Sequence, residues 1–249
     1  MQFVSHEYKC KESYARRYND TFRDLCQEEI KMLKLIKKEI LLCLHPTSFI
    51  FLSFALLIFV PNYPYEVIFF FSCLSVYFSC IMSRENGDIA FTCALPVKKS
   101  VIPLAKILTA VGLQCILLLL TGIAGAVKGA VFPVEIFINQ AGLSANIAML
   151  GNCAILLGTF NIIFFPLYFK SPEKIGAPFI ISSIFMFLLI SLFIILRWTT
   201  PLFSKTLNGL NTENTLAKSA MFLTGFGAYI VLTAIGCKAS MNAFQKVDV

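Results

Sequence analysis

Apolar residues in this chain form long runs that are separated by short polar segments. Six runs approach the length that a membrane-spanning helix needs, about 20 residues at a rise of about 1.5 Å each. They cover approximately residues 47–60, 65–82, 101–127, 143–166, 177–197 and 218–236. We therefore predict an all-α polytopic membrane protein, with six transmembrane helices in a domain at residues 47–236 and a cytoplasmic tail at 237–249.

The first run is the shortest of the six. Residues 47–60 give roughly 21 Å of helix, which is less than the ~30 Å hydrocarbon core of a bilayer. The run gains length if residues 41–44 join it across Pro46 with a kink, because proline lacks a backbone donor. The Pro-Asn-Tyr-Pro sequence at 61–64 predicts a tight turn, so the first two runs should form a hairpin.

An apolar stripe precedes the first run and consists of Phe22, Cys26, Ile30, Leu33, Ile36, Ile40 and Leu44. These residues recur every three or four positions, as one face of a helix does. The lysines at 31, 34, 37 and 38 lie off the stripe. We predict that residues 22–46 form an amphipathic helix at the membrane interface, with its basic face toward anionic lipid. The alternative is a helix packed on a soluble domain, for which little chain is present. Residues 1–21 are a polar extension without an assigned function.

The overall composition agrees with a membrane protein. Hydrophobic residues make up 57% of the chain and charged residues 14%, whereas soluble domains carry about 25% charged residues. This composition excludes a disordered chain, a secreted disulfide scaffold and a nucleic-acid-binding domain. The first part of the chain is charged and lacks the apolar core of a secretory signal peptide, so we expect insertion to depend on the transmembrane helices.

Basic residues are divided unequally between the two sides of the predicted topology. If the N-terminus is inside, 17 of the 21 Lys and Arg lie on inner segments, and the other four are Lys128, Arg197, Lys205 and Lys218. Loops rich in Lys and Arg stay in the cytoplasm. We therefore predict a multi-pass protein of the plasma membrane with both termini cytoplasmic.

Residues suited to catalysis or metal binding are few. The nine cysteines include no Cys-x-x-Cys pair, and two histidines offer little for a metal site. No acidic residue lies in the middle of a run, and Lys106 is near enough to a boundary to snorkel, which argues against an ion-coupled carrier. Neither a Ser-His-Asp set nor a carboxylate pair can be assembled in the membrane. We expect no catalytic residue, no metal and no cofactor on this chain. It also lacks a P-loop, so energy for transport would come from another polypeptide.

Three amides lie within the apolar runs: Gln114, Asn152 and Asn161. Such groups either bond neighbouring helices or face a hydrated pathway. The pair Gly125-x-x-x-Gly129 is a weak signal of close helix packing, and Lys128 between the glycines weakens it further.

The loop between the second and third runs, residues 84–100, carries the most information. We predict a short helix after Gly87, with Asp88 at its N-terminus, where the helix dipole favours negative charge, and with its end before Pro96. The apolar content of this loop exceeds what a solvated loop keeps, and it indicates a cytoplasmic docking surface. An interfacial re-entry loop is the alternative. The apolar residues are Ile89, Phe91, Ala94 and Leu95.

The same loop carries a family resemblance. Glu-Asn-Gly-Asp at 85–88, Leu-Pro-Val-Lys-Lys-Ser at 95–100 and Leu-Ala-Lys at 104–106 resemble the inner-loop signature of bacterial ABC type-2 permeases. More narrowly, the chain resembles the compact six-span branch that includes membrane subunits of phenol-soluble modulin exporters in Gram-positive bacteria. The stretch 165–174 and the tail with Ser240 and Lys246 are also similar to that branch. The resemblance covers about residues 34–249.

The resemblance implies a transport subunit and not an enzyme. Such a permease pairs with a second copy or a paralogue, and with separate ATP-binding subunits that hold ATP and Mg. In that family, short cytoplasmic coupling helices transmit closure of the ATP-binding subunits to the permease. We expect apolar residues to fill a groove on the partner and carboxylates to fix their register. The candidate coupling residues are Glu85, Asp88, Ile89, Phe91, Leu95 and Pro96.

The leading hypothesis is therefore the permease of an ABC exporter. An apolar chamber with few charges suits amphipathic or hydrophobic cargo, such as a peptide toxin, a bacteriocin or a drug. The alternative is a passive channel or membrane-scaffold protein without an ATPase partner, and a membrane enzyme ranks third. Co-purification of an ATPase distinguishes the first two classes.

Overall fold

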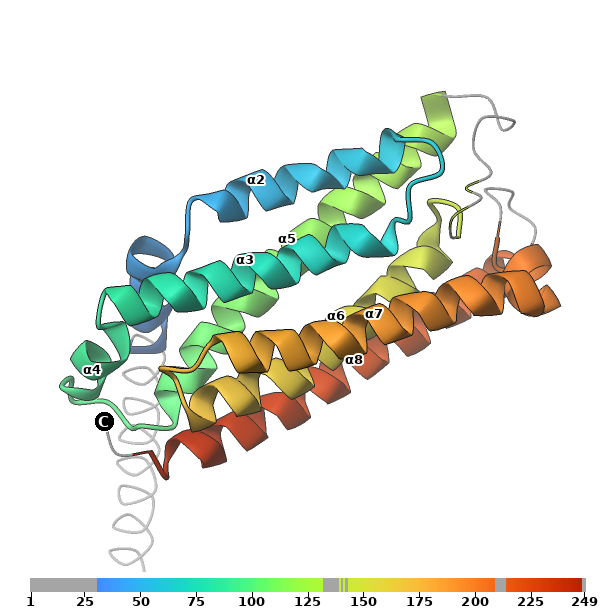
Figure 1. Cartoon of the computed structure of the whole chain (residues 1–249). Helices are drawn as coiled ribbons and strands as arrows, with labels where there is room; N and C mark the ends of the chain where they lie inside the picture. The colour runs from blue at the N-terminus through green and yellow to red at the C-terminus, as the bar shows by residue number, and fades with distance from the viewer. Residues whose placement is uncertain (1–30, 132–138, 140, 142, 209–213, 248–249) are drawn as a thin grey trace, which may run out of the picture.

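The computed structural model describes residues 31–131, 139, 141, 143–208 and 214–247 (Figure 1). The predicted extension at 1–21 and the first part of the predicted interfacial helix, 22–30, lie outside these residues. In order, the elements are η1 (Glu39–Cys43), α2 (Thr47–Ser53), η2 (Phe54–Phe59), α3 (Glu66–Glu85), α4 (Asp88–Cys93), α5 (Val101–Val131), α6 (Ile147–Lys170), α7 (Gly176–Thr199), η4 (Leu202–Thr206) and α8 (Thr215–Phe244).

The described chain is a bundle of helices that lie roughly along one direction (Figure 1). In it, α3, α5, α6, α7 and α8 are long and apolar enough to cross a membrane. A sixth span is present if Lys31–Cys43 and Thr47–Phe59 count as one. The prediction of an all-α polytopic membrane protein is therefore confirmed. Several helices continue past the predicted apolar runs, since a helical backbone extends through the polar ends.

The N-terminal pair of helices is sharply bent. The axes of Lys31–Cys43 and Thr47–Phe59 differ by 93°. Leu44 has an extended backbone, and Pro46 stands directly before α2. Proline disfavours a helical conformation in the residue before it and lacks a backbone donor, so the helix is interrupted at residues 44–46. Residues 41–43 thus belong to the N-terminal helix and do not continue α2 as a straight helix. The second half of that span, η2, is a 3₁₀ helix, which has a longer rise per residue.

The first two spans form a hairpin, with α2 beside α3 (Figure 1). The turn at 61–64 is tight because Asn62 adopts a left-handed backbone conformation with a φ of 56°. Asparagine tolerates this region better than most residues do.

Helices α6 and α8 pack with their backbones in contact. A Cβ on Gly151 would lie 2.5 Å from the carbonyl oxygen of Met221, and one on Gly225 would overlap the Gly151 carbonyl. Near the other end of the pair, a Cβ on Gly236 would lie 2.9 Å from the Asn161 carbonyl oxygen. Small residues at such spacing let transmembrane helices approach closely, so these glycines fix how α6 and α8 cross.

Helix α6 supplies most of the aromatic core. The rings of Phe160 and Phe164 stack at 4.8 Å between centroids, and Phe164 stacks on Tyr168 at 5.8 Å. All three side chains are fully buried. Helices α3, α5, α7 and α8 all contact α6, so it is the central element of the bundle.

The outer surface is apolar over much of α7 and α8. Large side chains exposed on α7 include Ile180, Ile184, Leu188, Leu192 and Ile195, and those on α8 include Leu223, Ile230, Val231 and Ile235. This is the surface that a hydrocarbon solvent requires, because lipid tails are themselves apolar.

Charged residues are concentrated at one end of the bundle, which we call the basic end. It contains the bend at 44–46, α4, the loop at 171–175 and residues 245–247 (Figure 1). Exposed lysines there include Lys34, Lys37, Lys98, Lys99, Lys170, Lys174 and Lys246. At the opposite end Lys205 is exposed, whereas Lys128, Arg197 and Lys218 are buried. Most exposed lysines of the described residues therefore lie at the basic end.

The close contact of α6 and α8 gives a first testable expectation. Gly225→Ala should reduce the free energy of unfolding by about 1–3 kcal/mol or more, because the added methyl meets backbone that cannot turn away. Thermal unfolding in detergent, followed by circular dichroism, measures the loss. Gly227→Ala on the same helix has open space around its Cβ and should leave stability unchanged or higher. Equal stability of both variants would contradict the proposed contact.

Candidate functional site

The turn after α3 positions the short helix α4. Gly87 has a φ of +60°, a left-handed conformation that glycine adopts without steric cost. The chain therefore reverses after α3 and begins α4 at Asp88. The predicted helix after Gly87 is confirmed, and it ends at Cys93, before Pro96.

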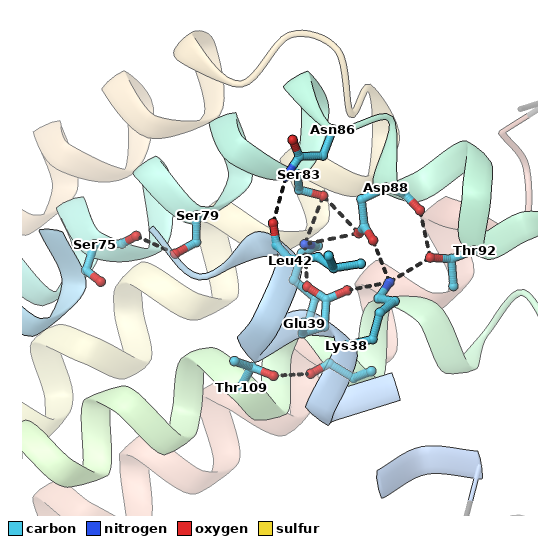
Figure 2. Close-up of polar contacts among 12 residues, drawn as sticks. Lys38, Glu39, Leu42, Ser75, Ser79, Ser83, Asn86, Asp88, Thr92 and Thr109 are labelled. Atoms are coloured by element: carbon cyan, nitrogen blue, oxygen red, sulfur yellow. Dashed lines mark hydrogen bonds and ion pairs between the residues drawn. The ribbon is translucent and has the colours of Figure 1, made fainter. Parts of the chain in front are cut away.

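Four charged side chains meet between α4 and the rest of the bundle: Lys38, Glu39, Asp88 and Lys106. The Lys106 Nζ donates to Glu39 Oε2 at 2.7 Å and lies 3.8 Å from Asp88 Oδ2. The Lys38 Nζ lies 2.6 Å from Asp88 Oδ1 and 3.1 Å from Glu39 Oε1. Each ammonium group is thus shared by two carboxylates, as Figure 2 shows around Glu39 and Asp88. We call these four residues the charge cluster.

Hydroxyl groups complete the hydrogen bonding of the charge cluster. The Ser83 hydroxyl donates to Asp88 Oδ2 at 3.1 Å and accepts a bond from Lys106 at 3.1 Å. Lys38 also donates to the Thr92 hydroxyl at 2.6 Å, and that hydroxyl donates to the Asp88 carbonyl (Figure 2). A buried charge is tolerated only when it is paired and hydrogen-bonded, and here both conditions hold.

The charge cluster connects three segments of the chain, and Ser83 adds a fourth through its hydrogen bonds. Lys38 and Glu39 come from the N-terminal helix, Ser83 from the end of α3, Asp88 from α4 and Lys106 from α5. A further bond links the N-terminal helix to the α3–α4 turn, because the Asn86 side chain donates to the Leu42 carbonyl at 2.7 Å. The short helix α4 is therefore bound to the transmembrane bundle through the N-terminal helix, α3 and α5.

The electrostatic environment keeps Asp88 ionised. Burial alone would raise the pKa of this carboxyl, but the charges of Lys106 and Lys38 and the hydrogen bond from Lys38 outweigh it. The net result is a pKa below the ordinary value of 3.8.

Glu39, Cys43 and Asp88 bring possible metal ligands within 4.8 Å of one another. Their carboxylates are, however, already bound to two ammonium groups, so a cation would have to displace Lys38 or Lys106. The arrangement suits an ion-pair network better than a metal centre.

Sequence reasoning did not anticipate the charge cluster. The expectation that Lys106 snorkels to solvent is wrong, because the residue is only 5% exposed. In the N-terminal helix, Leu33 and Ile40 of the predicted stripe are exposed, and Leu35, Glu39 and Cys43 form the buried row. The sequence feature that indicates a buried carboxylate is the four-residue spacing of Leu35, Glu39 and Cys43, which places Glu39 on an otherwise apolar face of the helix.

The candidate coupling residues divide into an outer and an inner set. Phe91 is 56% exposed, and Glu85 and Pro96 are also exposed. Ile89 and Leu95 are half-buried. Asp88, which we expected to face a partner, is 3% exposed and belongs to the charge cluster. Its side chain can influence a partner only by fixing the position of α4.

Two of the three amides in the spans bond to each other. Gln114 donates to Asn161 at 2.8 Å and Asn161 donates back at 2.9 Å. Tyr229 donates to Gln114 at 2.9 Å, and Asn161 donates to Thr233 at 3.0 Å. These bonds join α5, α6 and α8. Asn152 is also fully buried, and among the described residues neither polar atom of its amide has a hydrogen-bond partner.

Basic residues at the opposite end stabilise loops of the same chain. Lys128 donates to the Ile58 carbonyl and to the Tyr65 hydroxyl, both at 2.7 Å. Arg197 donates to the Asn139 carbonyl at 2.6 Å. Gly125 of the predicted packing pattern faces Ala145 of this chain, where a Cβ would lie 3.3 Å from the carbonyl oxygen.

A groove of about 470 Å³ opens beside α4, between α4 and the loop that joins α6 to α7. We call it the α4 groove. Arg84 bridges its two sides, because the guanidinium donates to the Glu173 carbonyl at 3.4 Å. The lining residues are Ser83, Arg84, Gly87, Ile89, Ala90, Lys170, Ser171, Pro172, Glu173, Lys174 and Val247.

The charge cluster predicts a non-additive mutational response. Lys106→Met should lower the free energy of unfolding by about 3–5 kcal/mol, because it leaves buried carboxylates with one cation fewer. The double variant Lys106→Met/Glu39→Gln should lose less than the sum of the two single changes. Unfolding in mixed detergent micelles measures all three, with the exposed Lys238→Met as a control. Additive losses would show that the two groups do not interact.

The cluster also predicts a dependence on acid. Since the folded-state pKa of Asp88 lies below its unfolded value, the stabilisation is complete above about pH 4 and is lost as the pH falls through the folded pKa. Unfolding should be followed from pH 7 to pH 3 for the wild type and Asp88→Asn. The variant should be less stable at pH 7 and should lose less on acidification. Parallel curves would contradict the assignment.

Comparison with known proteins identifies the family. Residues 34–245 match the family model described as ABC-2 family transporter protein. Neither a curated protein nor a solved structure matches the chain. The matched segment includes the charge cluster, α4 and α5 to α8. The chain therefore belongs to the ABC-2 family of transporter proteins and is a multi-pass membrane permease of an ABC transporter.

Proposed function

We propose that this permease works in an ATP-driven exporter of amphipathic or hydrophobic cargo and that α4 is its coupling helix. The observation that carries the proposal is the position of α4. The helix exposes an aromatic side chain, Phe91, on the basic end, and its opposite face is bound into the bundle by the charge cluster. An element of this kind can transmit a movement of a soluble partner to transmembrane helices.

The orientation follows from the charge of the two ends. Exposed lysines gather on the basic end, and cytoplasmic segments are rich in Lys and Arg. We therefore assign the basic end, with α4 and the 171–175 loop, to the cytoplasm, and we propose that both termini are on the same side. ATP-binding subunits act in the cytoplasm, so α4 lies on the side where they are available.

Each coupling residue takes a role that follows from its exposure. Phe91 and Ile89 supply apolar contacts with the ATP-binding subunit, since aromatic and aliphatic anchors dominate such interfaces. Glu85 is an exposed charge that fixes orientation. Leu95 and Pro96 end the docking segment. Asp88 acts as a positioning residue, because its carboxylate holds α4 on Lys38 and Lys106.

The cargo class rests on the surface that α3 and α7 present. A groove of about 470 Å³ between them is lined by Phe70, Phe179, Ile180, Ser183, Ile184, Phe187, Leu188 and Ser191. Such a lining suits an apolar or amphipathic molecule better than a sugar or an ion. The phenol-soluble modulin exporters of Gram-positive bacteria, which the inner loop resembles, are the branch that we propose. Gln114 and Asn161 then serve as contacts between helices, and Asn152 is the amide left for a pathway.

A second copy or a paralogue completes the transporter in this proposal. One chain gives a closed bundle whose core is filled by α6, and a shared pathway between two chains is the simplest way to make room for cargo. The broad apolar faces of α7 and α8 would be covered by lipid or by that second chain.

The proposal is tested by purifying the tagged permease from membranes of its own host. A co-purifying subunit with a Walker motif, identified by mass spectrometry, and ATP hydrolysis by the complex are expected. A permease that never binds an ATPase would instead support the passive channel or scaffold. Hydrolytic activity of the single chain would support a membrane enzyme.

Replacement of α4 anchors gives the matching prediction. Phe91→Asp should weaken binding of the ATP-binding subunit by about 2 kcal/mol, roughly thirtyfold, if this ring is a central anchor. Binding is measured by co-purification and by transporter-coupled ATP turnover in nanodiscs. Leu202→Asp, on an exposed residue of the opposite end, is the control and should bind normally. If Phe91→Asp and Ile89→Asp both retain full binding and turnover, α4 is not the coupling helix.

A further inference from the structure

We propose that the α4 groove is a second contact site for the ATP-binding subunit and that it receives an acidic segment of that subunit with an apolar side chain at its centre. This inference rests on the proposed function and extends it. In the coupling-helix model the permease inserts α4 into its partner, whereas here the partner also inserts a segment into the permease.

Two loops far apart in the sequence build the groove. One wall is the α3–α4 turn with Arg84, and the other is the end of α6 with the loop that follows it, from Lys170 to Lys174. The bond from Arg84 to the Glu173 carbonyl joins the walls. The bond from Lys99 to the Val247 carbonyl, at 3.3 Å, holds the end of α8 at the third side. The groove is therefore built by the fold and does not depend on a single flexible loop.

The charge of the groove selects the occupant. Arg84, Lys170 and Lys174 line it and are exposed, and Glu173 is the exposed carboxylate among the described lining residues. Asp88 lies close by, but its charge is compensated by Lys38 and Lys106 inside the charge cluster. The exposed excess is positive, so a segment with carboxylates at its edges is complementary.

The floor of the groove selects the centre of that segment. Ile89, Ala90, Pro172 and Val247 provide an apolar surface between the charged walls. A volume of about 470 Å³ is within the range of sites that bury a small ligand, about 300–1,000 Å³, and accommodates one or two side chains of a protein segment. An apolar side chain flanked by carboxylates fits both the floor and the walls.

Anionic lipid is the competing occupant, because phosphate headgroups also bind lysine and arginine. The apolar floor argues for a protein segment. Ile89 and Ala90 of this floor directly precede Phe91 on α4, so the groove and Phe91 belong to the same short helix, which the proposed function assigns to the ATP-binding subunit. A single partner can then contact Phe91 and the groove together.

Charge reversal tests the proposal on the complete permease. Lys170→Glu/Lys174→Glu should weaken binding of the co-purified ATP-binding subunit by about tenfold or more, because two attractive contacts become repulsive. The neutral pair Lys170→Gln/Lys174→Gln should give a smaller loss of binding. It removes the attraction without adding repulsion, so a graded loss between the two pairs distinguishes a charge effect from misfolding. The matched control is Lys238→Glu/Lys246→Glu, two exposed lysines of the same end that do not line the groove. Binding is measured in nanodiscs of phosphatidylcholine, with no anionic lipid, and again with phosphatidylglycerol.

A photo-cross-linking residue at Ala90, which is exposed and lines the groove, identifies what enters it. We expect a covalent product with an acidic segment of the ATP-binding subunit. Replacing the carboxylates of that segment by lysine should restore binding to the charge-reversed permease.

Three results would overturn the inference. They are normal binding by the charge-reversed permease, an effect that appears only with phosphatidylglycerol, and cross-links to lipid alone. None of these results affects the proposed function as long as the wild-type permease still binds its ATPase and the Phe91→Asp variant weakens that binding. Loss of ATPase binding by the wild type itself would instead refute the proposed function.

Discussion

The arrangement at the basic end depends on the requirement that buried charges be neutralised in place. Lys106 enters the bundle on α5, where water cannot solvate it, and Glu39 and Asp88 meet it from two other segments. Lys38 balances the second carboxylate. Removing any one of the four leaves an uncompensated buried charge, which costs far more than an exposed ion pair contributes. The N-terminal helix, α4 and α5 consequently form one mechanical unit.

A different constraint holds the other side of the bundle. Gly151 and Gly225 allow α6 and α8 to touch backbone to backbone, and the aromatic row of α6 packs on the surrounding helices. Here van der Waals contact replaces charge, as is usual between helices that share an apolar solvent. The amide pair of Gln114 and Asn161 connects this second unit to α5. The two units also share one hydrophobic core, because α3 and α5 pack against α6.

The fold could be predicted from the sequence because hydrophobic length is a direct consequence of bilayer thickness. The short helix after Gly87 could be predicted as well, since the glycine and Pro96 mark its limits locally. The charge cluster could not, because Lys38, Asp88 and Lys106 are distant in sequence and the pairing depends on how three segments pack. The bend at Pro46 was an open alternative, and its 93° angle is set by the same packing. Residue patterns along the chain predict the local helices. The ion pairs between residues distant in sequence can be identified only from the three-dimensional structure.

The α4 groove lies where the unit held by the charge cluster meets the unit built on α6 and α8. Its Arg84 wall belongs to the unit held by the charge cluster, and its Lys170 wall belongs to the unit built on α6 and α8. A partner segment bound between these walls contacts both units at once. Closure of two ATP-binding subunits would then act on the angle between the units and not on α4 alone. Because the interior of the bundle is closely packed, a displacement at the basic end would be carried along the helices to the opposite end, where the proposed function requires a pathway for cargo.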